Sequence, residues 1–255
     1  MNNVNKTLYI PLRGKACVSR KGIILHDPRA EEIWAAEEFP LKGKSKSKWL
    51  AYYMGMRAAV FDRWLAAQME ADPTAVILHI GCGMDSRCLR VGVQNHRWFD
   101  IDFPDVIGER KRYYRESEHY RMISGDVTKP HWLEAIPGGN AIIVMEGVSM
   151  YLPPEELKKA LDRVEEHFDR VSLLMDCYSS FAARASRYKN PINDVGVTKV
   201  FGMDDPNALP GFFREHEMTP EDLINQLSGM ERKIFRRLYA GGMARKMYRL
   251  YEYRR

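Results

Sequence analysis

Acidic residues stand at or just past the ends of strand-like segments at four places, and their positions point to a site for a small organic ligand. The four residues and their segments are Asp85 just past AVILHIGC (75–82), Asp102 ending RWFDID (97–102), Asp126 ending YRMISGD (120–126) and Glu146 near the end of NAIIVMEGV (140–148). The carboxyl ends of parallel strands meet at one edge of a sheet, where α/β proteins bind their ligands. We therefore expect the four carboxylates to surround one binding site.

A glycine turn, Gly81-Cys82-Gly83, follows the first of these segments and precedes a helix-like stretch. Strand–glycine turn–helix patterns of this kind are typical of nucleotide-binding proteins, because residues without side chains let a ligand approach the main chain. Asp102 comes 21 residues after Gly81, a spacing typical of an acid that accepts hydrogen bonds from ribose hydroxyls. These features predict a cofactor that contains a nucleoside.

A dinucleotide fits this turn poorly. Its pyrophosphate would lie close to Asp85, with a repulsion of about 1–4 kcal/mol depending on screening. Ser86 also stands where the dinucleotide fingerprint has its third glycine. A nucleoside that carries a sulfonium and an ammonium group would instead be attracted to the carboxylates. We therefore expect S-adenosylmethionine as the cofactor, and a dinucleotide oxidoreductase is disfavoured.

Some of these residues also have a purely structural interpretation. Asp85 alone is compatible with a helix N-cap, and Asp126 alone with a turn. His79, inside the first apolar segment, is expected to be buried with a hydrogen-bond partner. The four acids taken together with the glycine turn favour cofactor binding over a set of separate structural roles.

Strand-like and helical segments alternate through the middle of the chain. Unbroken apolar runs such as AVILHIGC are typical of strands buried on both faces, and strands that alternate with helices form parallel sheets. The expected strands span 75–82, 97–102, 120–126, 140–148 and 170–178. The sequence therefore predicts an α/β fold with a mostly parallel sheet covered on both faces.

The last part of the chain has a different pattern. Residues 189–216 contain many Gly, Pro and Asn residues and are expected to form a loop or lid over the site. Residues 231–240 and 246–255 are predicted to be two strands joined across Gly241-Gly242, and so short a connection makes them antiparallel. The sheet should therefore end in an antiparallel hairpin.

The first part of the chain contains turns and amphipathic segments, among them a long helix expected over about 49–70. We interpret residues 1–70 as a helical cap and the whole chain, 1–255, as one domain. No run approaches the roughly 20 apolar residues that a membrane span needs, and the N-terminus has no pattern of a secretory signal. Cysteines without metal-ligand or disulfide spacing predict a cytoplasmic protein without a metal site.

Positive charge gathers near the C-terminus. The net charge of the chain is +5, and residues 231–255 hold nine Lys or Arg against two Glu. A nucleic-acid site is the functional interpretation of such a segment. No stacking motif or nucleic-acid signature accompanies the charge, so we interpret it as a solvated outer face.

Six motifs occur in order over roughly the first 160 residues: PLRGKACVSRKGIILHDPRA (11–30), MGMRAAVFD (54–62), HIGCGMDSR (79–87), FDIDFPDVI (99–107), GDV (125–127) and EGVSMYLPPEEL (146–157). Together they resemble the leucine carboxyl methyltransferase family, in particular its bacterial branch of polyketide-type O-methyltransferases. The resemblance implies a class I methyltransferase fold, in which a seven-stranded sheet ends in an antiparallel pair. It also implies S-adenosylmethionine as the methyl donor.

The resemblance further implies which residues contact the cofactor. Gly81, Cys82 and Gly83 are expected to contact the methionine part, Asp102 the ribose hydroxyls, and Asp126 and Val127 the adenine. Glu146 is expected to contact the methionine amine. Arg57 and, in a looser match, Lys15 are expected to contact the methionine carboxylate. A guanidinium suits the carboxylate because it can bind both oxygens at once. Asp85 belongs to the same cofactor-binding edge.

The sequence says less about the methyl acceptor. A carboxylate is already ionised at neutral pH and needs no base, whereas a hydroxyl of high pKa needs one within hydrogen-bond reach. No His-Asp pair stands beside the acidic edge, which favours a small, polyketide-like acid or acidic phenol as acceptor. Arg87 and Tyr151 are expected to orient it, although Tyr151 also suits a core position. The alternatives are a protein C-terminal carboxylate as acceptor and a non-catalytic cofactor-binding module. Nothing in the sequence indicates an oligomeric state.

Overall fold

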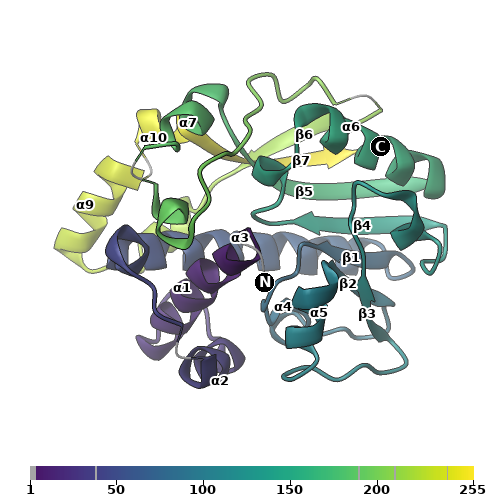
Figure 1. The fold of residues 1–255 in the computed structure, drawn as a ribbon, viewed down its shortest axis with the longest axis horizontal. Coiled ribbons are helices and arrows are strands. Elements are labelled where there is room, and N and C mark those ends of the chain that lie inside the picture. The colour runs from purple at the N-terminus through teal and green to yellow at the C-terminus, as the bar shows by residue number, and fades with distance from the viewer. Residues whose placement is uncertain (1–3, 38, 189, 210, 240) are drawn as a thin grey trace.

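The computed structural model describes residues 4–37, 39–188, 190–209, 211–239 and 241–255 and contains one seven-stranded sheet (Figure 1). The strands are β1 (Val76–Ile80), β2 (Trp98–Asp102), β3 (Tyr120–Ser124), β4 (Asn140–Met145), β5 (Arg170–Tyr178), β6 (Phe213–Met218) and β7 (Tyr248–Arg254). Their order is β3-β2-β1-β4-β5-β7-β6. Strands β1 to β5 pair in parallel, and β7 pairs antiparallel with both β5 and β6. The predicted α/β class and the antiparallel final pair are confirmed.

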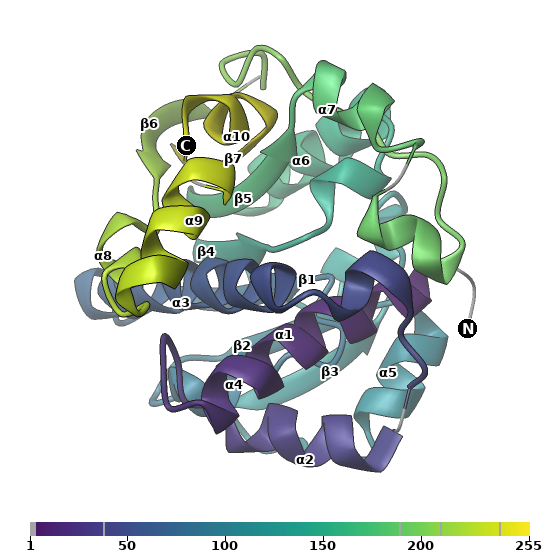
Figure 2. The same cartoon turned by 90° about the vertical axis from the view of Figure 1, so that its left-hand side faces the viewer.

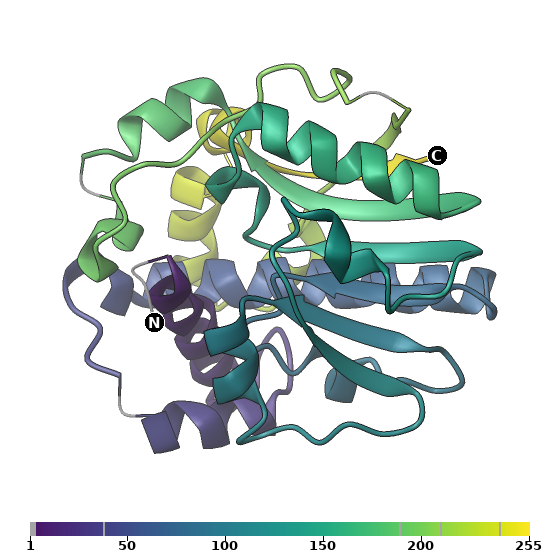
Figure 3. The same cartoon turned by 45° about the vertical axis from the view of Figure 1, so that its right-hand side comes forward.

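Helices cover both faces of this sheet, with α3 (Lys48–Ala71) on one face and α6 (Pro154–His167) on the other (Figure 3). Successive residues of β4 point to opposite faces. Ile142 belongs to the hydrophobic cluster under α3, whereas Ile143 belongs to the cluster under α6. Because both faces are buried, the strand needs apolar residues at every position, which explains its unbroken apolar run.

The N-terminal segment forms three helical elements, η1 (Asn5–Leu8), α1 (Tyr9–Arg20) and α2 (Pro28–Glu37), and α1 packs along α3 (Figure 2). Two glycines allow this close approach. A Cβ at Gly14 would overlap Cβ of Met54, and a Cβ at Gly55 would lie only 2.6 Å from Cγ2 of Val18. The long helix predicted over 49–70 is confirmed as α3.

The C-terminal hairpin differs from the prediction. Residues 246–255 contain a strand, β7, but the segment predicted as its partner forms helix α9 (Gly229–Tyr239), followed by α10 (Gly242–Met247). Phe235 of α9 is fully buried, whereas Arg236 and Arg237 are exposed, so this segment buries one side of a helix. The antiparallel partner of β7 is β6, which lies within the segment predicted as a loop or lid.

The remaining helical elements are short. They are η2 (Gly43–Lys46), α4 (Arg87–Arg90), α5 (Pro104–Arg110), η3 (Pro130–Leu133), η4 (Ser149–Tyr151), α7 (Ser180–Ala185), η5 (Pro191–Val195) and α8 (Glu221–Ile224). Within 189–216, residues 189 and 210 lie outside the described residues, and residues 213–216 belong to β6. The segment between η5 and β6 is bonded to the site: the N–H of Phe201 donates to Met150 O at 2.8 Å, and that of Met203 to Tyr178 O at 2.7 Å.

Several basic residues of the C-terminal segment pair with acids. Arg236 lies 3.6 Å from Glu221, Arg254 lies 3.4 Å from Glu215, and Arg255 lies 3.0 Å from Glu165. Such pairing agrees with a solvated outer face. None of the helices described here has the length and apolar character needed to cross a membrane.

The turn after β1 depends on its first glycine. Gly81 has φ +67, a conformation that residues with a Cβ rarely adopt, and a Cβ there would overlap Cγ2 of Val148. Gly83 also has a positive φ, +51, and lies against Leu8 of η1. The turn can therefore pass directly beneath the loop after β4.

We expect Gly81→Ala to lower the free energy of unfolding by about 1–3 kcal/mol, because it adds an overlap with Val148 to the strain of a positive φ. Denaturant-induced unfolding measures the change. The matched control is Gly92→Ala, where φ is +83 and nothing lies within 4 Å of the added Cβ. If both variants lost the same stability, close packing at position 81 would not be what requires glycine there.

Candidate active site

A cavity of about 920 Å³ opens at the carboxyl ends of the parallel strands. The cavity lies where the strand order reverses: β2 and β3 lie on one side of β1 in the sheet, and β4 lies on its other side. Ligands of open α/β sheets bind at this position. Of the residues predicted from the sequence, ten line it: Lys15, Arg57, Gly81, Cys82, Gly83, Asp85, Asp102, Val127, Glu146 and Tyr151.

Asp102 reaches from the end of β2 to the glycine turn. Its Oδ2 accepts a hydrogen bond from the N–H of Gly83 at 2.7 Å, and its Oδ1 accepts from the N–H of Phe103 at 2.8 Å. Burial raises the pKa of this carboxyl to about 6. A carboxylate oxygen can accept more than one hydrogen bond, so both oxygens keep acceptor capacity towards the cavity.

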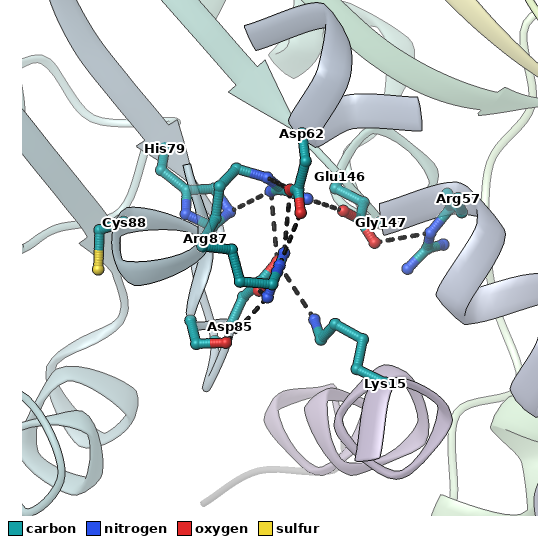
Figure 4. A network of polar contacts seen from close by, with 12 residues as sticks. Lys15, Arg57, Asp62, His79, Asp85, Arg87, Cys88, Glu146 and Gly147 are labelled. Carbon is teal, nitrogen blue, oxygen red and sulfur yellow. Dashed lines mark hydrogen bonds and ion pairs between the residues drawn. The ribbon is translucent and has the colours of Figure 1, made fainter. Parts of the chain in front are cut away.

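Asp85 is held by three cations. Its oxygens lie 3.2 Å from Nζ of Lys15, 2.7 Å from a guanidinium nitrogen of Arg90 and 3.3 Å from one of Arg87. These cations hold the pKa of Asp85 well below its usual range, although burial alone would raise it. Asp85 is not a helix N-cap: Ser86 occupies that position of α4. Figure 4 shows Lys15 reaching from α1 towards this cluster.

Arg87 lies at the centre of the charged network. It bonds Oδ1 of Asp62 at 2.7 Å and makes an ion pair with Glu146, and Figure 4 shows it between these two acids. Its side chain is 0% exposed, and it does not line the cavity. Its donors are already used within the protein, so Arg87 can orient the acceptor only through these partners, and that role stays a prediction.

His79 is buried in β1 and completes the environment of Arg87. A guanidinium can only donate, so the 2.9 Å contact from Arg87 makes Nε2 of His79 an acceptor. Nδ1 therefore carries the proton, and it faces Asp100 at 3.3 Å. Burial lowers the pKa of His79, in agreement with a neutral ring. The predicted buried histidine with a polar partner is confirmed.

Arg57 projects from α3 to the ends of β4 and β5. Its Nε lies 2.9 Å from Glu146, and Nη1 lies 3.1 Å from Asp176 and 2.7 Å from the hydroxyl oxygen of Tyr248. Arg57 and Arg87 thus share Glu146, and they lower the pKa of its buried carboxyl to about 2. Glu146 is ionised at neutral pH as a result.

Asp126 and Val127 both follow β3, but only one of them lines the cavity. Oδ1 of Asp126 accepts hydrogen bonds from the N–H of Thr128 at 2.9 Å and from its hydroxyl at 2.7 Å. This is the turn geometry considered for Asp126, which does not line the cavity. Gly125 and Val127 do line it.

Several tyrosines line the cavity as well. Tyr151, in η4, is half-buried and lines the cavity, and burial raises its pKa. Tyr53, Tyr178 and Tyr248 line it as well, among apolar residues that include Met150. This part of the cavity combines apolar surface with a few hydroxyl groups, the usual composition of a small-molecule site.

Asp176 and Tyr248 are functional candidates that sequence reasoning missed. Asp176 stands near the end of the apolar run RVSLLMDCY and follows the same rule as the four acids that were found. Tyr248 had no such signal, because its place in the site depends on β7 pairing next to β5. Within the described part of the chain, no group of three or more His, Cys, Asp or Glu side chains is placed to hold a metal ion.

Two solved structures illustrate which proteins share this fold. Magnesium protoporphyrin IX methyltransferase (ChlM) from Synechocystis PCC 6803, with bound SAH, has a TM-score of 0.52 at 12% identity and covers 89% of this chain and 93% of its own. A duf574 family protein from Streptomyces avermitilis has a TM-score of 0.55 at 12% identity, covering 89% of this chain and 88% of its own. These likenesses show that the chain has the class I methyltransferase fold.

Sequence comparison identifies the family. The model of the family described as leucine carboxyl methyltransferase matches residues 13–165. Tetracenomycin polyketide synthesis O-methyltransferase TcmP from Streptomyces glaucescens is 31% identical over 212 residues, which are 82% of this chain and 78% of that protein. The S-adenosyl-L-methionine-dependent methyltransferase dpfgK from Gibberella zeae is 30% identical over 182 residues, 65% of this chain and 61% of that protein. The chain belongs to the leucine carboxyl methyltransferase family.

We expect Arg87→Met to lower the free energy of unfolding by about 3–5 kcal/mol, because it leaves buried Glu146 and Asp85 with one cation fewer. Denaturant-induced unfolding measures the loss. Arg63→Met is the matched control: Arg63 pairs with Asp222 at the surface, and such pairs contribute about 0–1 kcal/mol. Equal losses in the two variants would show that the buried network does not stabilise the fold beyond a surface pair.

Proposed function

We propose that this chain transfers a methyl group from S-adenosylmethionine to an oxygen atom of a small-molecule acceptor, a carboxylate or an acidic hydroxyl. The observation that carries the proposal is the cavity, whose lining includes the glycine turn together with tyrosines and apolar side chains. Its volume, about 920 Å³, is in the range of small-molecule sites. TcmP, the relative named as a polyketide synthesis O-methyltransferase, supports the same class of reaction.

The residues at the glycine turn suit the cofactor in charge and in shape. Gly81 and Gly83 leave room for the methionine part, beside Cys82, and Asp102 offers its oxygens to the ribose hydroxyls. S-adenosylmethionine supplies the reactive methyl group on its sulfonium. Val127 would border the adenine, while Asp126 would act there only through its turn.

The charged groups of the cofactor find partners among residues already fixed by ion pairs. Glu146 is ionised and suits the ammonium group of the cofactor's methionine part. Arg57 and Lys15 line the cavity and are the cations for the carboxylate of that methionine part. Asp85 would act by holding Lys15 in place. Side chains fixed before the ligand arrives lose little conformational freedom on binding.

The acceptor would lie against Tyr151, which lines the cavity at the end of β4. Arg87 would position the site through Glu146 instead of touching the acceptor. We also infer that the N-terminal elements and the segment 190–209 form the outer wall, since Leu8 and Ile192 both line the cavity. Ser45 of η2 holds this wall together by donating its N–H to Asp194 of η5 at 2.9 Å.

Calorimetry and methyl transfer test the proposal together. We expect S-adenosylhomocysteine to bind with micromolar affinity, NAD not to bind, and Asp102→Ala to weaken the affinity for S-adenosylhomocysteine by about 10-fold or more, since it removes hydrogen bonds to a charged group. Radiolabelled S-adenosylmethionine should then transfer methyl groups to small aromatic acids or phenols. Label that appeared only as a base-labile ester on protein would instead support the protein carboxyl methyltransferase.

A pH dependence of cofactor affinity should follow from Asp102, whose pKa is about 6. Ribose hydroxyls donate to the ionised carboxylate, so binding favours the deprotonated form. Above pH 6 that form already dominates and affinity for S-adenosylhomocysteine is constant. Below pH 6 a proton must leave first, and affinity falls by up to about tenfold per pH unit. Calorimetry between about pH 5 and 8 measures this.

Asp102→Asn is the control for this titration, because its amide cannot ionise in that range. It should bind more weakly than the wild type at neutral pH and show no step near pH 6. A step of the same size in both proteins would assign the titration to another group.

A further inference from the structure

The end of β5 presents a buried carboxylate that the roles proposed above do not use. Asp176 is 0% exposed. Its Oδ1 accepts a hydrogen bond from the N–H of Gly147 at 2.7 Å, and its Oδ2 lies 3.1 Å from Arg57 and accepts from the hydroxyl of Tyr248. Asp176 does not line the cavity, but Tyr248 does. The tyrosine hydroxyl therefore connects the cavity to the carboxylate behind it.

The ring of Tyr248 is fixed from two sides. Tyr53 of α3 and Tyr178 of β5 pack edge-on against it, with ring centroids 5.6 and 5.1 Å away. Its oxygen accepts from Arg57 at 2.7 Å and donates to Asp176. A hydroxyl oxygen has two acceptor positions, and Arg57 uses one of them. The other is available to a hydroxyl donor in the cavity.

The surroundings of Tyr248 and Asp176 favour Asp176, and not Tyr248, as the group that keeps a transferred proton. Burial raises the pKa of Asp176, while Arg57 opposes this rise and Glu146 adds to it. Burial also raises the pKa of Tyr248 well above its ordinary value, with Arg57 lowering it and Asp176, Tyr53 and Tyr178 raising it. Tyr248 thus stays a phenol at neutral pH, and Asp176 is the better final proton acceptor.

We propose that Tyr248 and Asp176 form a proton relay for a hydroxyl acceptor, so that the site methylates phenols whose hydroxyl needs a base. This rests on the proposed O-methyl transfer. The acceptor O–H proton passes to the oxygen of Tyr248, and the Tyr248 proton passes to Asp176. The acceptor oxygen forms its bond to the methyl carbon, and the pair of the broken C–S bond stays on sulfur. The products are the methyl ether, S-adenosylhomocysteine and protonated Asp176.

A carboxylate acceptor would leave this relay without a role. It brings no proton to remove at neutral pH, so its transfer needs position alone. A phenol and a carboxylic acid on the same ring system therefore separate the two cases. We use 2-naphthol and 2-naphthoic acid as this matched pair.

The decisive variant is Tyr248→Phe, which keeps the ring and removes the hydroxyl. With 2-naphthol we expect kcat to fall about 100-fold or more, the range typical of a lost acid–base group, and the remaining activity to rise with pH as naphtholate forms in solution. With 2-naphthoic acid we expect little change. The affinity for S-adenosylhomocysteine, measured by calorimetry, should stay within about threefold of the wild type, a difference below 1 kcal/mol.

Tyr251→Phe is the matched control, since Tyr251 lies on the same strand, is buried and does not line the cavity. Asp176→Asn should show the same selective loss as Tyr248→Phe. A second readout is independent of turnover: 4-nitrophenol bound with S-adenosylhomocysteine should ionise, as followed by its phenolate absorbance, at a higher pH in Tyr248→Phe than in the wild type.

The outcomes separate the relay from the proposed function. Transfer to 2-naphthoic acid but not to 2-naphthol would overturn the relay and leave the proposed function intact. An equal loss with both acceptors, or unchanged ionisation of bound 4-nitrophenol, would overturn it too and reduce Tyr248 to a support for Arg57. Transfer to neither probe, with S-adenosylhomocysteine still bound, would overturn the small-molecule acceptor class together with the relay.

Discussion

The ion pairs around Arg87 are the constraint on which the site depends. Charges taken out of water are costly unless partners and hydrogen bonds surround them. Asp62 of α3, Asp85 of the glycine turn and Glu146 after β4 all bind this guanidinium. Segments far apart in the sequence must therefore come together before any of these charges can be buried, which fixes α3 and the turn on the sheet edge. Lys15 extends the same constraint to α1.

The parts of the fold that follow from local pattern were predictable. An unbroken apolar run can only be a strand buried on both faces or a buried helix, and length and flanking glycines decide between them. For the five parallel strands and α3 that reasoning was sufficient. At α9 it failed: Ile234 and Phe235 interrupt a basic segment in a way that suits a short strand or one side of a helix. The true edge strand, β6, exposes most of its side chains, so its sequence FREHEM has no apolar alternation.

The site shows the same division between local and long-range information. Gly81, Asp102 and Glu146 were predictable because each immediately follows or ends a strand, and parallel strand ends share one edge. Arg87 also stands after a strand, but the sequence could not say whether its guanidinium points to the cavity or inwards. That depends on Asp62 and His79, which reach it from other elements. Tyr248 is the opposite case: it is remote in sequence and enters the site only because β7 pairs with β5.

Arg57 lies between Glu146, which follows β4, and the pair formed by Asp176 of β5 and Tyr248 of β7. Glu146 holds its Nε, while Asp176 and Tyr248 hold Nη1, so the group is fixed before any ligand arrives. A cation already balanced by two carboxylates attracts a third anion less strongly than a free arginine would, because its charge is largely compensated. The same balance suits the neutral hydroxyl acceptor that we propose near Tyr248. In the proposed function the carboxylate of the cofactor would be that third anion, with Lys15 beside it, and a neutral hydroxyl acceptor would add no unpaired charge to the buried site.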